Sequence, residues 1–183
     1  MEFIDITKEP SKYKNQVWEL YENAFPPEEK KPRKLMEDME KEGKMELLAA
    51  VEEVEFIGLV FNMLNGKTAL LDYFAIAPEH RSQGYGGRII REMLEKFKDK
   101  KYIFEIEMQD ENAQNAEDRK RRKAFYLRNG LKETGVFANV YQTDFELLPP
   151  EGKLTYDEYI RMLVEMLGSR VESHLKPFLI REE

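Results

Sequence analysis

Short apolar runs bounded by turn residues recur along the first half of the chain, and such runs predict β-strands. Three of them follow one another, over residues 45–51, 55–63 and 68–76, and a shorter run around Phe3, Ile4 and Ile6 precedes them. Asn65-Gly66 is a strong signal for a hairpin turn between the last two runs. With a turn at Glu52-Glu53, we expect these three strands to form an antiparallel meander.

Apolar residues at helical spacing lie between and after these runs. Pro10 closes the first strand, and Ser11 is placed to cap a helix that runs to about Ala24 and ends before Phe25-Pro26-Pro27. A short helix follows around Leu35 to Met39 and ends near Gly43. The remaining chain predicts helices over residues 83–98 and 117–129, and strands over residues 102–108, 131–136 and 139–147.

Pro149-Pro150-Glu151-Gly152 marks a candidate boundary near the end of the chain. Beyond it, an amphipathic helix is expected from about Tyr156 to Gly168, and Thr155-x-x-Glu158 has the form of a capping box. We therefore expect a domain over residues 1–148 and a helical extension over residues 149–183. The extension is interpreted as a helix packed on the domain, with a homodimer contact or a cover for the active site as alternatives.

Composition narrows the function classes. A chain of 183 residues with 42% apolar residues suits one domain, and its net charge of −7 argues against non-specific nucleic-acid binding. The chain has no cysteine and only two histidines, His80 and His174, which argues against a metal site and against thiol chemistry. No apolar run reaches the ~18 residues of a membrane span, and the N-terminus lacks the features of a secretory signal. We therefore expect a cytoplasmic protein.

The segment from Tyr73 to Arg88 carries the strongest chemical signal. An apolar run ends at Pro78, a glycine-rich turn follows, and apolar residues then return at helical spacing. A strand, a glycine-rich turn and a helix N-terminus in this order bind phosphate groups, because backbone N–H groups can approach the anion closely. The glycine positions 84, 86 and 87 match neither a P-loop nor a dinucleotide fingerprint.

Two motifs in this order resemble the GNAT-type N-acetyltransferase superfamily. Arg81-x-x-Gly84-x-Gly86 resembles the family's pyrophosphate-binding turn, and Ala124-Phe125-Tyr126 with Gly130 and Gly135 resembles its late helix and the exit from it. The alternative for the first motif is a helix-capping turn with an incidental arginine. The resemblance implies an α/β fold with a mixed, mainly antiparallel sheet and helices on both faces, and it implies acetyl-CoA as co-substrate.

The resemblance also implies where the cofactor lies. Phe74, Ala75 and Ile76 match the segment whose backbone pairs with the pantetheine arm. Backbone N–H groups of the turn would hold the pyrophosphate, while Arg81 adds positive charge. The expected cofactor-binding residues are Phe74, Ala75, Ile76, Arg81, Gln83, Gly84, Tyr85, Gly86 and Gly87.

Three residues are candidates for catalysis. Tyr126 matches the family's usual general-acid position, with a half-buried core tyrosine as the alternative. Glu105 shares one strand face with Glu107 and is a candidate base, unless that face is solvated or the carboxylates pair with Arg119, Arg121 or Arg122. Asp72 interrupts an apolar strand and is a rival base, with an edge-facing or salt-bridged aspartate as the alternative. The basic run 119–123 would attract the cofactor's 3′-phosphate or pair with nearby acidic residues.

We therefore predict an enzyme that moves an acetyl group from acetyl-CoA to a primary amine by direct attack. A small-molecule amine or a peptide is the expected partner, and the loop from Phe25 to Arg33 and the face with Glu105 would line its pocket. The acidic balance is compatible with a cationic acceptor. The alternative is a catalytically silent protein that binds CoA as a sensor or as a partner-binding module; a phosphate-binding α/β protein of unrelated chemistry is a further rival.

Overall fold

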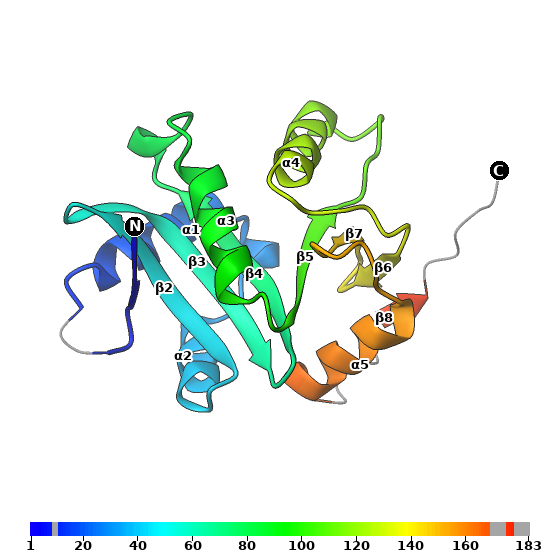
Figure 1. Cartoon of the computed structure of the whole chain (residues 1–183), viewed down its shortest axis with the longest axis horizontal. Coiled ribbons are helices and arrows are strands. Elements are labelled where there is room, and N and C mark those ends of the chain that lie inside the picture. The colour runs from blue at the N-terminus through cyan, green and yellow to red at the C-terminus, as the bar shows by residue number, and fades with distance from the viewer. Residues whose placement is uncertain (9–10, 169–174, 178–183) are drawn as a thin grey trace. The chain divides into compact units, whose positions relative to one another are not determined.

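The computed structural model describes residues 1–8, 11–168 and 175–177, and Figure 1 shows their helices and strands. The chain divides into two compact units. The first unit contains Met1–Leu64 and Leu71–Lys96, and the second contains Asn65–Leu70 and Phe97–Glu183.

The sheet of the first unit is an antiparallel meander, as the sequence predicts. It contains β1 (Glu2–Asp5), β2 (Met45–Glu52), β3 (Glu55–Asn65) and β4 (Thr68–Ile76), in that order across the sheet. In the register of these strands, Phe3 is paired with Ala50, and Leu47 is paired with Phe61. The turn between β2 and β3 lies at Glu53 and Val54, whose φ angles are 47° and 74°, one residue later than predicted.

Three α-helices and two single 3₁₀ turns complete the first unit: α1 (Lys14–Ala24), η1 (Pro27–Glu29), α2 (Arg33–Lys41), η2 (Pro78–His80) and α3 (Tyr85–Lys96). The prediction that Ser11 caps the first helix is wrong. Tyr13 is the N-cap, and the buried Ser11 hydroxyl has no partner among the described residues. The Ser11 carbonyl instead accepts from the Lys14 N–H in a separate turn, so the helix begins later. The predicted role of Pro10 lies outside the described residues.

The helices of the first unit lie on both faces of its strands. Phe61 of β3 contacts the rings of Trp18 and Tyr21 from α1, with centroid distances of 5.7 and 5.8 Å. The next residue, Asn62, points the other way and approaches the Met93 sulfur of α3. Because successive side chains of a strand point to opposite faces, α1 and α3 cover opposite sides of the sheet. Figure 1 shows α3 in front of these strands and α1 behind them.

The second unit is built on four strands and two helices: β5 (Lys101–Glu107), α4 (Ala116–Arg128), β6 (Phe137–Val140), β7 (Thr143–Leu148), α5 (Tyr156–Leu167) and β8 (Leu175–Pro177). The strand order is β5-β7-β6-β8, and each of these neighbours pairs antiparallel. The residues that begin β4 also belong here, and the Lys101 N–H donates to the Lys67 carbonyl at 2.8 Å. β4 and β5 therefore start side by side and run parallel, so the predicted mixed, mainly antiparallel sheet is confirmed.

The predicted strands after α4 need a correction. Residues 131–136 form a loop, because Gly135 has a φ of 70° and the Thr134 hydroxyl bonds both the Leu147 carbonyl and the Val136 N–H. The single strand predicted over residues 139–147 is a hairpin of β6 and β7. Its turn is at Tyr141 and Gln142, which have φ angles of 48° and 69° without a glycine to announce them.

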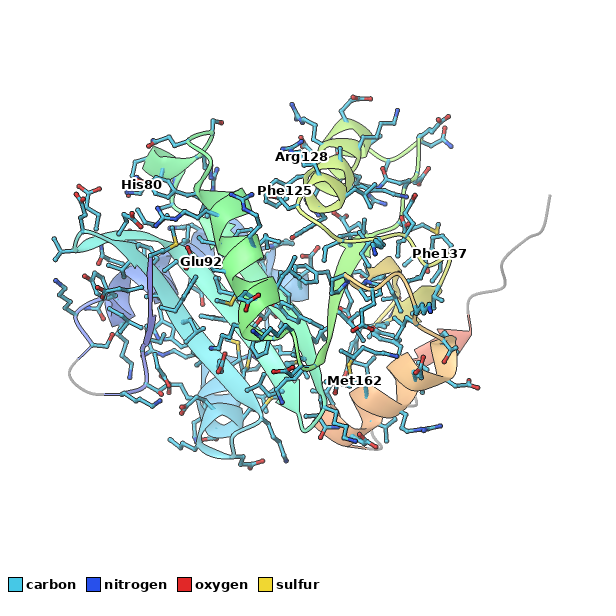
Figure 2. The ribbon with its side chains drawn as sticks, viewed as in Figure 1. His80, Glu92, Phe125, Arg128, Phe137 and Met162 are labelled. Atoms are coloured by element: carbon cyan, nitrogen blue, oxygen red, sulfur yellow. The ribbon has the colours of Figure 1, made fainter. Side chains whose placement is uncertain are left out.

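The helix near the C-terminus is placed as predicted. Thr155 and Glu158 form both hydrogen bonds of a capping box, which stabilises a helix by about 1 kcal/mol, and Gly168 ends α5. Tyr159, Met162, Leu163 and Met166 bury their side chains, and Figure 2 labels Met162. α5 lies in the same unit as β5 and α4. Among the described residues, no helix is long and apolar enough to cross a membrane.

Candidate functional site

The turn after β4 has the geometry of an anion site. Gly84 has a φ of 87°, a conformation that costs a residue with a side chain about 1 kcal/mol or more. The first hydrogen bond of α3 runs from the Arg88 N–H to the Gly84 carbonyl. The N–H groups of Tyr85, Gly86 and Gly87 come before that bond and have no acceptor within the helix. They point out of the N-terminus of a 12-residue helix, whose dipole favours an anion there.

The side chains of the turn mostly hold its backbone. Arg81 is exposed and donates from Nε to the Ile76 carbonyl at 3.1 Å, and Gln83 donates from Nε2 to the Glu79 carbonyl at 2.7 Å. The His80 ring meets the Tyr85 ring edge-on at 5.7 Å. Figure 2 shows His80 in the turn ahead of α3. Arg81 and Gln83 therefore fix the loop that presents the N–H groups.

Arg88 lies one turn into α3 and pairs with acidic residues. Its guanidinium lies 2.8 Å from the Glu52 carboxylate and 3.3 Å from that of Glu92, which Figure 2 labels on α3. The hydrogen bond to Glu52 is the main cause that raises the pKa of Arg88. Its charge is therefore partly balanced within the first unit.

The end of β4 approaches β3 unusually closely. A Cβ atom on Gly58 would lie 2.3 Å from the Ala75 carbonyl oxygen and 3.2 Å from the Ile76 Cα atom. The Ala77 N–H donates to the Ile57 carbonyl at 2.9 Å on the same stretch. Only glycine allows this approach, because any side chain would push β4 away. Phe74, Ala75 and Ile76 are half-buried at this place, so Gly58 sets the path of the segment expected to pair with pantetheine.

Asp72 lies four residues before the end of β4 and is salt-bridged. Its side chain is only 7% exposed, and Oδ1 lies 2.6 Å from the Lys31 ammonium. The second oxygen, Oδ2, is buried without a hydrogen-bond partner among the described residues. The same Lys31 ammonium lies over the Tyr73 ring, 5.2 Å from its centroid. The structure therefore shows the salt-bridged alternative for Asp72. One of its two carboxylate oxygens has no hydrogen-bond partner among the described residues.

Glu105 and its neighbour Phe104 point to opposite faces of β5. The Phe104 ring meets the Tyr126 ring of α4 at 5.5 Å, whereas the Glu105 carboxylate accepts a hydrogen bond from the Tyr159 hydroxyl of α5. Tyr159 is fully buried, and Glu105 is half-buried. The predicted strand face with Glu105 is therefore covered by α5, and Glu105 and Tyr126 lie on different sides of the strand.

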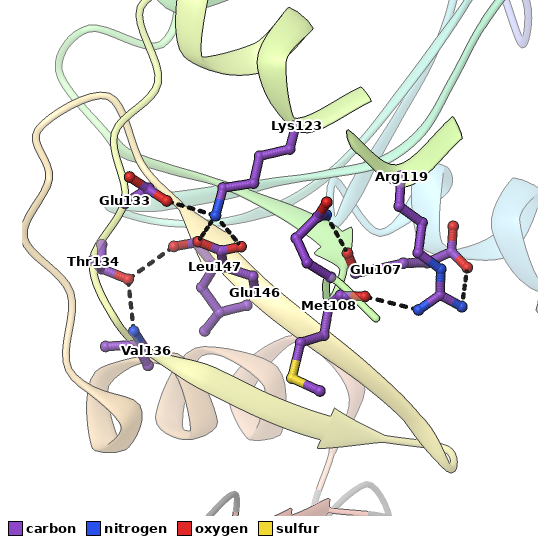
Figure 3. Close-up of polar contacts among 10 residues, drawn as sticks. Glu107, Met108, Arg119, Lys123, Glu133, Thr134, Val136, Glu146 and Leu147 are labelled. Atoms are coloured by element: carbon purple, nitrogen blue, oxygen red, sulfur yellow. Dashed lines mark hydrogen bonds and ion pairs between the residues drawn. The ribbon is translucent and has the colours of Figure 1, made fainter. Parts of the chain in front are cut away.

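Glu107 forms ion pairs with arginines, which is the predicted alternative to a catalytic role. Its carboxylate lies 3.1 Å from the Arg119 guanidinium and 2.5 Å from that of Arg122, as Figure 3 shows for Arg119. Arg119 also donates to the Met108 carbonyl at 2.7 Å. Glu107 therefore ties the end of β5 to the start of α4.

The rest of the basic run pairs with acidic residues as well. Lys123 contacts both oxygens of the buried Glu146, at 2.8 and 2.9 Å, and lies 2.5 Å from Glu133 (Figure 3). Arg121 bonds Asp118, and Lys120 lies 3.4 Å from Glu117. In the second unit, the run thus pins α4 to β5 and β7.

Tyr126 is buried on the inner side of α4. It is 8% exposed, and its ring touches Phe104 and, at 5.3 Å, Phe125. On the same helix, the Arg128 guanidinium lies 5.4 Å from the Phe125 ring centroid, and Figure 2 labels both residues. Desolvation raises the pKa of Tyr126 to about 12, and the Arg122 charge opposes that shift. Its phenol is therefore protonated at neutral pH and is able to donate a hydrogen bond.

The predicted residues fall into both units. Asp72, the segment 74–76 and the turn 81–87 belong to the first, and Glu105 and Tyr126 belong to the second. Three residues of the site were missed at the sequence level: Gly58, Lys31 and Tyr159. A glycine inside a strand is a signal of close backbone approach, so Gly58 could have been found. Lys31 and Tyr159 carry no such local signal.

A mixed sheet with helices on both faces and a glycine turn that opens a helix are the features that the resemblance to acetyltransferases implies. The chain belongs to the acetyltransferase (GNAT) family, whose model matches residues 14–130. This match includes the first motif and the second motif as far as Gly130, whereas Gly135 lies beyond it. No match is found among curated proteins.

Solved structures share the fold at low sequence identity. A protein assigned to the GNAT family from Bacteroides thetaiotaomicron is 22% identical, with a TM-score of 0.76 over 91% of this chain and 97% of its own. An aminoglycoside 6′-N-acetyltransferase complexed with coenzyme A is 17% identical, with a TM-score of 0.61 over 81% and 96%. A GNAT acetyltransferase from Elizabethkingia anophelis with acetyl-CoA bound is 18% identical, with a TM-score of 0.50 over 64% and 82%.

Proposed function

We propose that this protein is an N-acetyltransferase that moves an acetyl group from acetyl-CoA to a primary amine. The observation that carries the proposal is the turn at residues 81–87, which lies inside the family match and presents three N–H groups at the start of α3. Similar structures solved with acetyl-CoA or coenzyme A support the choice of co-substrate. The residues present fit a diphosphate, because the helix N-terminus is open to an anion.

Acetyl-CoA, when bound, supplies an activated thioester that an amine attacks directly, so the lack of cysteine is no obstacle. The N–H groups of residues 83–87 hold the diphosphate, with Arg81 bracing the turn. The backbone of Phe74, Ala75 and Ile76 pairs with the pantetheine arm. Gly58 keeps that segment in place, because it alone lets β4 approach β3 so closely.

Tyr126 acts as a hydrogen-bond donor to the leaving sulfur. Burial raises the pKa of Tyr126 to about 12, so the phenol keeps its proton at neutral pH and is able to donate a hydrogen bond to the sulfur. A hydrogen bond from a buried phenol stabilises a thiolate strongly, because few water molecules compete for it. The proposed role is therefore stabilisation of the leaving thiolate by a donated hydrogen bond.

Glu105 does not suit the predicted role of base, because α5 covers its face of β5 while Tyr126 lies on the other side of the strand. The reaction forms a bond between the amine nitrogen and the acetyl carbon and breaks the bond from that carbon to sulfur. We propose that the amine proton passes to a water molecule. The hydrogen bond from the Tyr159 hydroxyl holds the Glu105 carboxylate beside α5. Asp72 is already paired with Lys31.

An acetyl-CoA-dependent thiol-release screen over a panel of amines tests the proposal. We expect turnover with at least one primary amine, and we expect calorimetry to show binding of acetyl-CoA but not of ATP or NAD. Tight acetyl-CoA binding with no acceptor in any amine class would favour a silent CoA-binding sensor. Equal binding of ATP or NAD would count against the whole assignment.

Three expectations accompany the proposal and stay predictions. They are a cytoplasmic location, a boundary between residues 148 and 149, and a C-terminal extension that packs on the domain, with a homodimer contact as its alternative. Cell fractionation, limited proteolysis and sedimentation, respectively, measure them. The acceptor is proposed to be a small amine or a peptide rather than a nucleic acid, since the chain is acidic.

A further inference from the structure

The loop between α1 and α2 is fastened to β4 by two tyrosine hydroxyls. Tyr73 donates to the Glu29 carbonyl at 2.6 Å and accepts from the Lys31 N–H at 3.0 Å. Tyr21 donates to the Lys31 carbonyl at 3.0 Å. Burial raises the pKa of both phenols, so the two hydroxyls keep their protons at neutral pH. The backbone of Lys31 is thus held on both sides, and only its side chain is able to swing.

The Lys31 side chain places an ammonium group beside Asp72 and Tyr73. Its ammonium lies 2.6 Å from Asp72 Oδ1 and over the face of the Tyr73 ring. A buried carboxylate beside an aromatic face is a site for a primary ammonium, by charge pairing and by cation–π attraction. The Lys31 side chain is 27% exposed, whereas that of Asp72 is 7% exposed, so the cation lies at the rim and the anion lies deeper.

Asp72 has more acceptor capacity than Lys31 uses. An ionised carboxylate offers about four lone-pair positions, and Oδ2 is buried with no partner among the described residues. Such an unsatisfied oxygen costs about 1–3 kcal/mol. A ligand able to bring several N–H donors to this carboxylate would remove that cost.

We propose that Asp72 and Tyr73 form a binding site for the ammonium group of a cationic acceptor, and that Lys31 occupies this site as a displaceable internal competitor. The inference rests on the proposed function in one respect, namely that the acceptor is an amine. For a diamine or polyamine, the ammonium at Asp72 is the one that does not react.

The test uses the free analogue of the side chain seen in the site. The full chain is titrated with n-butylammonium chloride without acetyl-CoA, so absence of turnover does not affect the result. Trp18 is the only tryptophan, and its ring lies 5.7 Å from that of Tyr21, so its indole N–H resonance reports on the loop. n-Butanol and sodium chloride at equal concentrations are the reference solutes.

We expect Lys31→Met to lower the half-saturating concentration of n-butylammonium roughly tenfold. A competitor that fills the site about nine-tenths of the time leaves only about a tenth of the molecules able to bind, which weakens the apparent affinity about tenfold. Asp72→Asn should abolish saturable binding. Lys31→Arg retains a competing cation and should resemble the wild type. Lys30→Met is the matched control, since Lys30 pairs with Glu22 at 2.5 Å instead, and it should also leave the titration unchanged.

The proposal is overturned if Lys31→Met binds n-butylammonium no better than the wild type, or if n-butanol shifts the Trp18 resonance equally. Lys31→Met leaves the buried Asp72 without its cation, so Lys31→Gln, whose amide donates a hydrogen bond to Asp72, serves as a second test if Lys31→Met or Asp72→Asn fails to fold. Lys31→Gln should also bind n-butylammonium more tightly than the wild type. An inactive enzyme that still shows the tenfold change would reject the transferase function and keep the ammonium site. An active enzyme without the tenfold change would keep the transferase function and reject the ammonium site.

Discussion

The turn after β4 and the surroundings of Tyr126 use different kinds of atoms. In the turn, backbone N–H groups form the candidate site, and glycine conformation sets their direction. Around Tyr126 and Glu105, side chains form the candidate site, and the partners of these side chains come from α4, β5 and α5. A backbone site depends on a few adjacent residues, whereas a side-chain site depends on the packing of a whole unit. Changes in the first should alter cofactor affinity, and changes in the second should alter turnover or stability.

The largest effect is expected from Tyr126→Phe. Loss of the hydroxyl should lower kcat about 100-fold or more, with little change in acetyl-CoA affinity, because the hydrogen bond acts on the leaving sulfur. Steady-state kinetics and calorimetry measure the two quantities. Tyr102→Phe removes a phenol that also packs on Phe104, with ring centroids 4.6 Å apart, and should keep kcat within a few-fold. Equal losses in both variants would contradict the assigned role.

Lys123→Met should have the largest effect on stability. It leaves Glu146, whose side chain is 4% exposed, without its ammonium partner, and we expect a loss of about 2–3 kcal/mol in the free energy of unfolding. Denaturant titration measures this. Lys120→Met is the matched control, because Lys120 and Glu117 are both exposed, and it should change stability by less than about 0.5 kcal/mol.

The Lys123 contacts also predict a pH dependence. Burial alone would lower the pKa of Lys123, but its hydrogen bonds to Glu133 and Glu146 outweigh burial, and the pKa is raised above 10.5. A raised folded-state pKa adds stability that is complete below the unfolded value and is lost as the pH rises through the folded one. The difference between wild type and Lys123→Met should therefore stay constant near neutrality and shrink above about pH 10.5. A difference that shrinks between pH 6 and 8 would exclude this account.

Gly58→Ala should weaken the backbone site from outside the turn. The new methyl group would meet the Ala75 carbonyl at 2.3 Å, so β4 must move, at an expected cost of about 1–3 kcal/mol. Acetyl-CoA affinity should fall about tenfold while kcat at saturation changes little. Unchanged affinity would show that the segment 74–76 does not hold the cofactor.

The smallest effect is expected from Gly84→Ala, and its control is Gly43→Ala. Both glycines have positive φ, of 87° and 70°, and space for a methyl group, so each change should cost about 1 kcal/mol of stability. Only Gly84→Ala should also weaken acetyl-CoA binding, by several-fold, because its turn presents the N–H groups. Equal binding by the two variants would remove the distinction between the glycines.

The sequence predicted what depends on neighbouring residues. The glycine turn, the end of α4 at Asn129-Gly130 and the capping box at Thr155 are each specified within a few positions, and each was placed correctly. The hairpin turn at Tyr141-Gln142 was missed because neither residue favours positive φ. The pairs Lys31–Asp72 and Tyr159–Glu105 join positions 41 and 54 residues apart, and only the fold brings them together.

The hydrogen bond from Tyr159 to Glu105 bears on how the protein is handled in the laboratory. A chain shortened after Leu148, the boundary that composition suggests, would retain the whole stretch matched by the family model. It would also strip the cover from one face of β5 and leave a half-buried carboxylate facing water. A truncated enzyme with poor turnover would therefore say nothing about the intact one, and both trimming and tag removal should spare the region up to Gly168.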